Sequence, residues 1–263
     1  REIDLIEEIL RVYGYDNIES SSKLILSSKD YKIDNYKSIY NLLSKSLVGA
    51  GFNEIMTNSI CSPEANQLNN EHTPIEIINP QGIELSNLRV SLLPGMIDTI
   101  AFNINRQNKN LRLFEIGNTY QKIDKNNNER RTLSIALCGE VFEESWLVNY
   151  NTDNFFYLKG VIDKLFRDLS LQINYNAEND SNYSQNLSIN KGKERFGFIC
   201  ELNKKMLNKY SLDTKIYYAE IDISKIDVSK INTKYKEVSK FPSSRRDVSM
   251  ILDSKINFDE IKR

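Results

Sequence analysis

The chain has 263 residues, and its 35 Lys and Arg residues nearly balance its 36 Asp and Glu residues, for a net charge of −1. A protein that grips nucleic acid over a wide face is usually basic, so this chain is not expected to do so alone. Cys61, Cys138 and Cys200 are an odd, scattered set, which argues against a disulfide scaffold and for a reducing, cytoplasmic compartment. No stretch approaches the ~18 apolar residues of a membrane span, so no membrane partner is expected.

Residues 1–13 predict an amphipathic helix. Its apolar side chains recur at three- and four-residue spacing, which places them in one stripe: Ile3, Ile6, Leu10 and Tyr13. Gly14 is well placed to end this helix as a left-handed cap. The chain begins with Arg1 and not with Met, no capping residue precedes the helix, and the far end lies in a charged segment at Arg263. We therefore expect an internal piece of a larger protein, cut at both ends.

The next elements are a helix, a strand and a further helix. Residues 36–50 predict a helix that Asp34 caps and Gly51 ends, and residues 52–56 predict a strand directly after it. The predicted buried stripe of this helix consists of Tyr36, Ile39, Tyr40, Leu43, Leu47 and Ala50. Ser91 is expected to cap the following helix, whose apolar face consists of Met96, Ile97, Ile100, Ala101 and Ile104.

Strands dominate the second half of the chain. Residues 111–120 and 132–141 predict two strands around a polar stretch, 122–131, that we expect to be a solvated loop, and together they form an antiparallel hairpin. Thr152 or Asp153 is expected to cap another helix, with an inward face of Phe155, Leu158, Ile162, Leu165 and Phe166. The later elements are strands at 171–175, 196–202 and 216–223 and a short helix at 204–210. Hairpin-like strands among irregularly placed helices favour an α+β fold on an antiparallel sheet.

Conventional catalytic patterns are missing from the sequence. His72 is the single histidine and has no Cys near it in sequence, so we interpret it as an exposed loop residue and not as a base or metal ligand. Gly49-Ala50-Gly51 closes a helix and does not follow a strand, so the dinucleotide and P-loop fingerprints are absent. These patterns predict no complete active site in the chain.

Charged residues leave three alternatives open. Asp4, Glu7 and Glu8 lie on one helical face, where they either meet a hard cation such as Mg²⁺ or form a solvated acidic face near the positive end of the helix dipole. Basic residues around the third helix can form salt bridges or hold an anion: Arg89, Arg106 and Arg112. A later basic run favours a solvated face over contact with RNA phosphate: Lys191, Lys193, Arg195, Lys204, Lys205 and Lys209.

Several short motifs follow one another along nearly the whole chain. They are Ile6-Glu7-Glu8-Ile9-Leu10-Arg11-Val12-Tyr13-Gly14-Tyr15-Asp16-Asn17-Ile18, Gly51-Phe52-Asn53-Glu54, Asn79-Pro80, Leu88-Arg89-Val90-Ser91-Leu92-Leu93-Pro94-Gly95, Leu113-Phe114-Glu115-Ile116-Gly117, Phe156-Tyr157-Leu158-Lys159-Gly160 and Lys240-Phe241-Pro242-Ser243-Ser244-Arg245-Arg246-Asp247. In this order and approximate spacing they resemble the β subunit of bacterial phenylalanyl-tRNA synthetase, in the part that contains its class II synthetase-like core.

The resemblance implies a fold and a division of labour. It implies a class II aminoacyl-tRNA synthetase-like antiparallel sheet flanked by helices, with residues 36–50 and the following strand similar to class II motif 1 and the strands around 122–131 similar to the motif 2 hairpin. The arginine-bearing, glycine-rich motif 3 that holds ATP in active enzymes has no counterpart here. The family's β core is catalytically inactive, and its α subunit uses ATP to make phenylalanyl-adenylate and charge the tRNA.

The resemblance also implies ligands and partners. Family members bind Mg²⁺ at the α–β boundary through acidic residues of this helix, and Asp4, Glu7 and Glu8 match three of those positions. A further acidic ligand would precede Arg1, so the site in this chain is incomplete without it and without the α subunit. The implied partners are the α subunit, in an α₂β₂ tetramer, and tRNA(Phe).

Three domains follow from the matched motifs. Residues 1–20 resemble the end of a B5-type domain, residues 21–235 the class II synthetase-like core, and residues 236–263 the start of a ferredoxin-like anticodon-binding domain. The function implied is support of assembly with the α subunit and of tRNA positioning. The alternative is a free-standing class II-like paralogue that binds a small metabolite.

Overall fold

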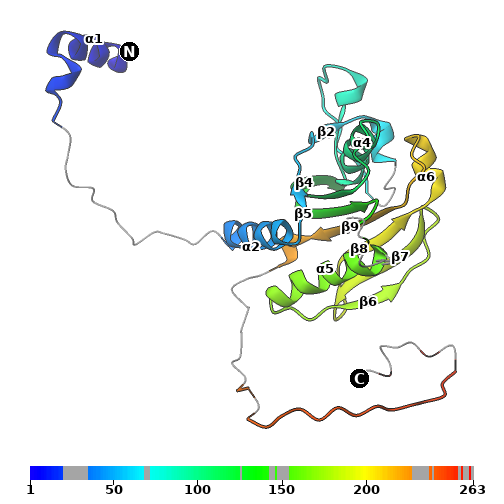
Figure 1. Cartoon of the computed structure of the whole chain (residues 1–263). Helices are drawn as coiled ribbons and strands as arrows, with labels where there is room; N and C mark the ends of the chain where they lie inside the picture. Colours follow the sequence, from blue (N-terminus) through cyan, green and yellow to red (C-terminus); the bar gives the residue numbers. More distant parts are fainter. Residues whose placement is uncertain are drawn as a thin grey trace.

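The computed structural model describes residues 1–19, 35–67, 72–124, 126–141, 146, 154–226, 237–238, 240–253, 256 and 261. A seven-stranded sheet forms the centre of the fold, and its strands lie in the order β1-β4-β5-β9-β8-β7-β6 (Figure 1). β1 pairs with β4 in parallel, and the other neighbouring pairs are antiparallel. The strands are β1 Asn53–Glu54, β4 Leu111–Ile123, β5 Asn126–Cys138, β6 Asn174–Ala177, β7 Tyr183–Lys191, β8 Glu194–Leu202 and β9 Ile216–Asp222.

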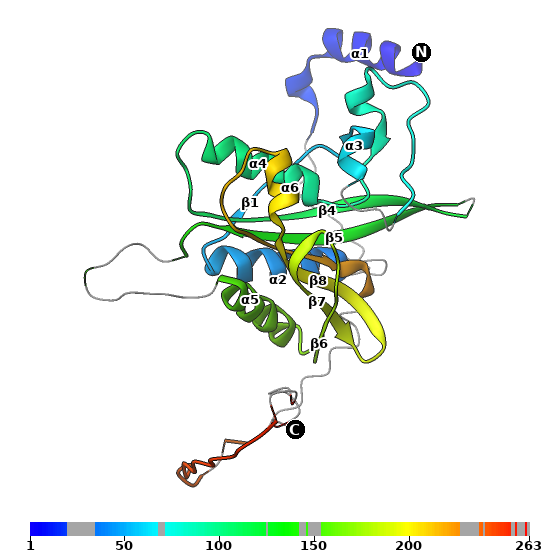
Figure 2. The ribbon, with the colours of Figure 1, turned by 90° about the vertical axis from the view of Figure 1, so that its right-hand side faces the viewer.

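Helices α2 (Asn35–Gly49) and α5 (Asn154–Asp168) cover one face of this sheet, which we call the first face (Figure 2). Helical spacing turns their apolar residues toward the strands, where they pack on the odd-numbered side chains of β5. The buried helical residues are Ile39, Leu43, Leu47, Phe155, Leu158, Ile162, Leu165 and Phe166. The inward face predicted for the second of these helices is therefore confirmed in full.

The opposite or second face of the sheet has two unlike halves. Helices α4 (Leu93–Ile104) and α6 (Lys204–Lys209) cover its apolar half. The core there includes Met96, Ile97, Ile100, Met206, Ala136, Cys138, Cys200 and Tyr218. The other half carries buried polar side chains, which include Arg89, Ser91, Glu115, Thr119, Gln121, Thr132, Ser134 and Glu220. This polar half holds the candidate site.

The stretch that we expected to be a loop at 122–131 is mostly strand. β4 and β5 pair without interruption from Leu111 and Cys138 to Ile123 and Asn126, and the turn between them includes Asp124, whose φ is 54°. The hairpin prediction is thus right and the loop prediction wrong, because an antiparallel partner satisfies the backbone hydrogen bonds of polar residues as well as of apolar ones. The resulting ribbon projects away from the helices (Figure 2).

Other elements differ from the prediction in length or position. The strand expected at 52–56 is reduced to β1, and the strand expected at 171–175 begins only at Asn174. β7 was not predicted, since its sequence, Tyr183–Lys191, is mostly polar, yet it pairs with β6 and β8. A small separate sheet joins β2 (Ile60–Cys61) and β3 (Asn87–Leu88), and the short helices are α3 Pro63–Asn66, η1 Tyr15–Asn17, η2 Ile83–Leu85 and η3 Ile223–Lys225.

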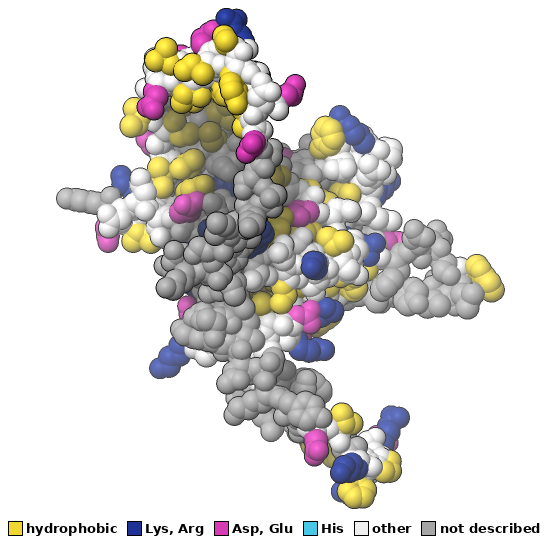
Figure 3. Space-filling model, turned by 90° about the vertical axis from the view of Figure 1, so that its left-hand side faces the viewer, with side chains coloured by type: hydrophobic (Ala, Val, Ile, Leu, Met, Phe, Trp, Pro, Cys, Tyr) yellow, Lys and Arg dark blue, Asp and Glu magenta, His cyan; other side chains and the backbone are white. Residues whose placement is uncertain are grey.

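The two flanking segments contribute little to this core. Helix α1 (Glu2–Tyr13) has no buried residue, and its hydrophobic side chains gather on the surface at the top of Figure 3. Gly14 ends it with a φ of 93°, but its ψ of 124° lies outside the left-handed helical region that we predicted. Residues 240–253 form neither helix nor strand. The predicted caps Asp34, Thr152 and Asp153 lie outside the described residues, and the domain limits 1–20, 21–235 and 236–263 stay predictions.

Two global expectations concern thiols and membranes. All three cysteines are free thiols, as expected of a chain without a disulfide scaffold. In the described part of the chain, no helix is long and apolar enough to cross a membrane.

Candidate functional site

A buried ion pair forms the first anchor of the polar half. Arg89, which follows β3, donates from its guanidinium to the Glu115 carboxylate of β4 at 2.8 Å, and the two side chains are only 7% and 2% exposed. Thr57 completes the network, since its hydroxyl accepts from Arg89 at 2.9 Å and donates to Glu115 at 2.7 Å. The Arg89 Nε also donates to the carbonyl of Asn118 at 2.9 Å. Each buried charge is therefore paired and hydrogen-bonded, as such groups must be.

Two residues further along, Ser91 forms the second anchor. Its hydroxyl donates to the Glu220 carboxylate of β9 at 2.6 Å and accepts from the Leu93 N–H at 3.1 Å. The Leu92 N–H, at the start of α4, donates to the same Glu220 oxygen at 3.3 Å, and the Tyr218 hydroxyl donates to it as well. Ser91 was predicted to be the cap of α4; Leu92 occupies that position instead, because the buried carboxylate draws the serine hydroxyl into the sheet.

Arg89 and Ser91, two residues apart, thus connect the start of α4 to strands β4 and β9. Gly117 makes room for the first tie, because a Cβ at this position would overlap the Arg89 guanidinium. Ser134 of β5 lies directly between the two anchors, opposite Glu115 on one side and Glu220 on the other. These contacts give a physical reason for the polar residues in the Leu88-Arg89-Val90-Ser91 and Phe114-Glu115-Ile116-Gly117 motifs.

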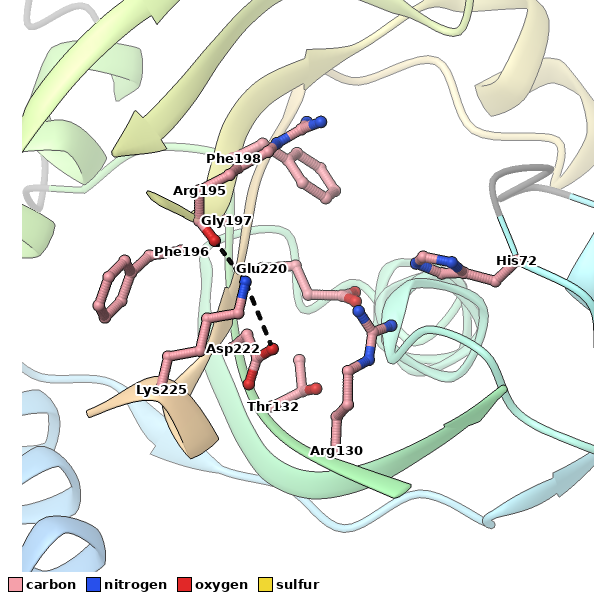
Figure 4. Close-up of a pocket in the computed structure, with 10 residues that line it drawn as sticks. All are labelled: His72, Arg130, Thr132, Arg195, Phe196, Gly197, Phe198, Glu220, Asp222 and Lys225. Carbon is pink, nitrogen blue, oxygen red and sulfur yellow. Dashed lines mark hydrogen bonds and ion pairs between the residues drawn. The ribbon is translucent and has the colours of Figure 1, made fainter. Parts of the chain in front are cut away.

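A pocket of about 170 Å³ opens beside the second anchor (Figure 4). Its walls come from β5, β8, β9, η3 and the segment before β4: His72, Arg130, Thr132, Arg195, Phe196, Gly197, Phe198, Glu220, Asp222 and Lys225. Lys225 donates to the Arg195 carbonyl at 2.6 Å and lies 3.9 Å from the Asp222 carboxylate, while the Arg195 guanidinium pairs with Glu178 at 3.1 Å. Figure 4 shows the Glu220 carboxylate and the Arg130 guanidinium turned toward each other on the other wall.

Electrostatics of the pocket centre on Glu220. Burial raises the pKa of this carboxyl group above its usual value, and the hydrogen bonds from Ser91, Tyr218 and the Leu92 N–H, together with the nearby Arg130 charge, oppose that rise. Burial also raises the pKa of the Cys200 thiol well above its usual value, so this thiol is not an activated nucleophile. The described side chains of the pocket can bind and orient a polar group.

The acidic trio of α1 lies apart from this pocket. Glu8 is 2.8 Å from Arg11, while Asp4 and Glu7 are exposed. Across the described ranges, no group of three or more His, Cys, Asp or Glu residues is arranged to hold a metal ion. The trio therefore supplies carboxylates of the kind that Mg²⁺ prefers but does not converge on a single point within this chain.

Other candidates from the sequence occupy simpler places. His72 lies outside any helix or strand, as its interpretation as a loop residue requires, but it is half-buried on the pocket wall and not exposed. Of the three arginines around α4, Arg89 forms the buried pair and Arg106 stacks 3.4 Å from the Phe102 ring centroid. Most of the later basic run is exposed. Sequence reasoning missed the roles of Glu115, Arg130 and Glu220, although a charged residue among apolar neighbours was a usable signal for Glu115 and Glu220.

A family model for the phenylalanyl tRNA synthetase beta chain CLM domain matches residues 27–223, which contain the whole sheet and its covering helices. The chain belongs to this family. It is 33% identical over its full length to a phenylalanine–tRNA ligase beta subunit from Bacteroides fragilis and 30% identical over 99% of its length to one from Streptococcus pneumoniae. The chain spans 34% of the length of each of these curated relatives.

Solved structures confirm the fold. Two crystal structures of the pyrrolysyl-tRNA synthetase PylSc from Desulfitobacterium hafniense superpose on the chain with TM-scores of 0.58 and 0.60. Both alignments cover 79% of the chain and 76% of the synthetase, at 14% and 13% identity. The expected class II synthetase-like fold, an antiparallel sheet flanked by helices, is thereby confirmed.

Proposed function

We propose that this chain is the non-catalytic core of the β subunit of a phenylalanine–tRNA ligase, the cytoplasmic enzyme that attaches phenylalanine to its tRNA with ATP. Its role is to support assembly with the catalytic α subunit and to help position tRNA(Phe). The observation that carries the proposal is the family match over residues 27–223, together with beta-subunit relatives that align along the full chain. The free-standing paralogue is not favoured, because those relatives are subunits of a larger enzyme.

The polar half of the second face supports a non-catalytic role. Its strongest polar groups are engaged in structure, since Glu115 holds Arg89 and Glu220 holds Ser91 and Tyr218. Protonation of Glu115 would leave the buried Arg89 charge without its counter-ion, which is costly. ATP is accordingly a substrate of the α subunit in this proposal.

Co-expression of the full-length β protein with the α subunit tests the assembly. We expect an α₂β₂ complex on size-exclusion chromatography with light scattering, and phenylalanylation of tRNA(Phe) that requires both subunits. Failure of the full-length β protein to bind α, or loss of its requirement for phenylalanylation, would overturn the proposal. Calorimetric titration of the β protein alone with ATP provides a second check, because tight ATP binding without α would favour the paralogue.

Mg²⁺ is proposed to bind where α1 meets the α subunit. The three carboxylates fit a hard, oxygen-preferring cation in charge and chemistry, and their exposure leaves them accessible to ligands from other parts of the complex. Asp4, Glu7 and Glu8 would hold the ion together with groups outside this chain. A bound Mg²⁺ supplies positive charge that neutralises the carboxylates and lets the two surfaces approach.

Glutamine substitutions test this metal site. Glu7→Gln combined with Glu8→Gln keeps side-chain size but removes two charges, so we expect assembly with α to need several-fold more Mg²⁺. Glu2→Gln combined with Asp16→Asn is the matched control, since both residues are exposed and the charge change is equal. Assembly that is unchanged across the Mg²⁺ titration would leave the trio as a solvated acidic face.

A further inference from the structure

One basic side chain in the pocket of the second face has a buried donor atom without an acceptor among the described residues. Arg130 of β5 lines the pocket, and its Nε is buried without a hydrogen-bond acceptor among the described residues. The other two cations of the pocket differ from it, because Arg195 pairs with Glu178 and Lys225 donates to the Arg195 carbonyl. A buried donor that loses its water without gaining an acceptor is energetically costly. Arg130 is therefore the group in this wall that most needs an acceptor from elsewhere.

The facing carboxylate, that of Glu220, can accept a further hydrogen bond. The hydrogen bonds to Glu220 from Ser91, Leu92 and Tyr218 all end on Oε2. Its Oε1 receives none in the described part of the chain, although a carboxylate can accept at both oxygens. Arg130 and Glu220 influence each other electrostatically but do not form a direct ion pair. Arg130 and Glu220 thus face the pocket as a donor and an acceptor that lie near each other without a hydrogen bond between them (Figure 4).

An apolar wall completes the site. The Phe198 ring points into the space between Glu220 and His72 in Figure 4. The ring is held from behind by Tyr183 and Tyr218, whose centroids lie 5.6 Å and 6.1 Å away. A Cβ at Gly197 would overlap the carbonyl oxygen of Glu220, so β8 and β9 approach closely along this wall and fix its shape. A rigid aromatic surface beside paired charges suits a small ligand with a short apolar part.

We propose that this pocket binds a free α-amino acid, with its carboxylate on Arg130, its ammonium group on Glu220 Oε1 and its side chain against Phe198. An α-amino acid carries a carboxylate and an ammonium group on one carbon atom, so a single small molecule meets both pocket groups and leaves neither charge unmatched. This site goes beyond the proposed assembly role and does not depend on it.

Isothermal titration of the assembled α–β complex, or of the β subunit if it is stable alone, tests the proposal. The probes are glycine, L-alanine and L-leucine, with acetate and propylamine as single-charge analogues. We expect saturable binding of at least one amino acid, and at least tenfold weaker binding of both analogues. The Arg130→Met and Glu220→Gln variants should each weaken amino-acid binding at least tenfold. Arg167→Met is the matched control, because Arg167 is an exposed arginine of α5 on the opposite face.

Each outcome decides the question. Equal binding by wild-type protein, Arg130→Met and Glu220→Gln, or no saturable binding of any amino acid, overturns the proposal. Acetate that binds as well as the amino acids overturns the ligand class and leaves an anion site. If Arg130→Met fails to fold by circular dichroism, hydrogen exchange on the wild type replaces it: the amino acid should slow exchange around 130–132 and 220–222, and unchanged exchange there is a negative result. Assembly with α is scored separately by chromatography, so failure of the proposed function is distinguishable.

Discussion

The two faces of the sheet are stabilised by different kinds of contact, although the same strands form both. On the first face, α2 and α5 close over aliphatic and aromatic residues, and the buried core of the contact is hydrophobic. On the second face, helices cover only half of the surface with apolar residues, and the polar half is held by the contacts Arg89–Glu115 and Ser91–Glu220. Hydrophobic contacts are strong but indifferent to register, whereas hydrogen-bonded charges require one geometry.

This difference indicates that one face mainly supplies the free energy of folding, whereas the other mainly fixes the positions of β3 and α4. The first face can supply most of the free energy of folding, because buried apolar area contributes about 25 cal/mol per Å². The second face can then carry buried charges that contribute little net stability but fix where β3 and α4 cross the sheet. Residues on the second face are accordingly the better candidates for binding roles, and residues on the first face for stability.

Breaking the buried ion pair should produce the largest effect. Glu115→Ala leaves the Arg89 guanidinium buried without its carboxylate, and we expect a loss of about 3–5 kcal/mol in the free energy of unfolding, measured by urea denaturation. Asp168→Ala removes the half-exposed pair with Lys164, at 2.7 Å, and should cost about 0–1 kcal/mol. Equal losses for the two variants would show that removal of a partner from the buried pair costs no more than removal from the half-exposed pair.

The first face is tested by a pair of neighbouring residues. Leu47 is fully buried against the sheet, and Leu47→Ala should cost about 2–5 kcal/mol through lost burial and the cavity left behind. Val48, next to it on α2, is 57% exposed, and Val48→Ala should stay within about 0.5 kcal/mol. Similar urea midpoints for the two variants would contradict the assignment of this face to the core.

Two glycines should respond to alanine with opposite signs. Gly197→Ala places a methyl group against the Glu220 backbone, which cannot move aside as a flexible side chain can, and we expect a loss of about 1–3 kcal/mol. Gly160 is exposed within α5 with nothing near its Cβ position, so Gly160→Ala should stabilise by about 1 kcal/mol. Thermal unfolding of both variants measures the contrast, and a destabilised Gly160→Ala would refute it.

Sequence reasoning located the first face far better than the second. Helical periodicity identified Ile39, Leu43 and Leu47 and the inward residues of α5, because burial on one side of a helix leaves a regular trace. It missed β7 and the outer part of the β4–β5 ribbon, because strands made mostly of polar residues carry no such trace even where backbone pairing holds them. The motif around Arg89 and Ser91 was noticed, but its partners Glu115 and Glu220 lie 26 and 129 residues away, and only the folded sheet brings them together.

The smallest expected effect concerns the protonation of Glu220. Burial raises the pKa of this carboxyl group in the folded chain, so the unfolded chain, with a pKa of about 4.3, releases its proton at lower pH than the folded chain does. Stability from this group is therefore fully present below about pH 4 and declines as the pH rises through the folded pKa. The groups that face Glu220 are Ser91, Tyr218, the Leu92 N–H and Arg130, and all four limit the rise.

Glu220→Gln removes this titration while its amide oxygen can still accept from Ser91 and Tyr218. The free energy of unfolding of wild type minus variant should hence fall between pH 4 and pH 8, as measured by urea denaturation at several pH values. Other carboxylates titrate alike in both proteins and cancel in this difference. A difference that stays flat or rises with pH would mean that the hydrogen bonds and Arg130 outweigh burial, in which case the second face holds Glu220 ionised more firmly than its burial indicates.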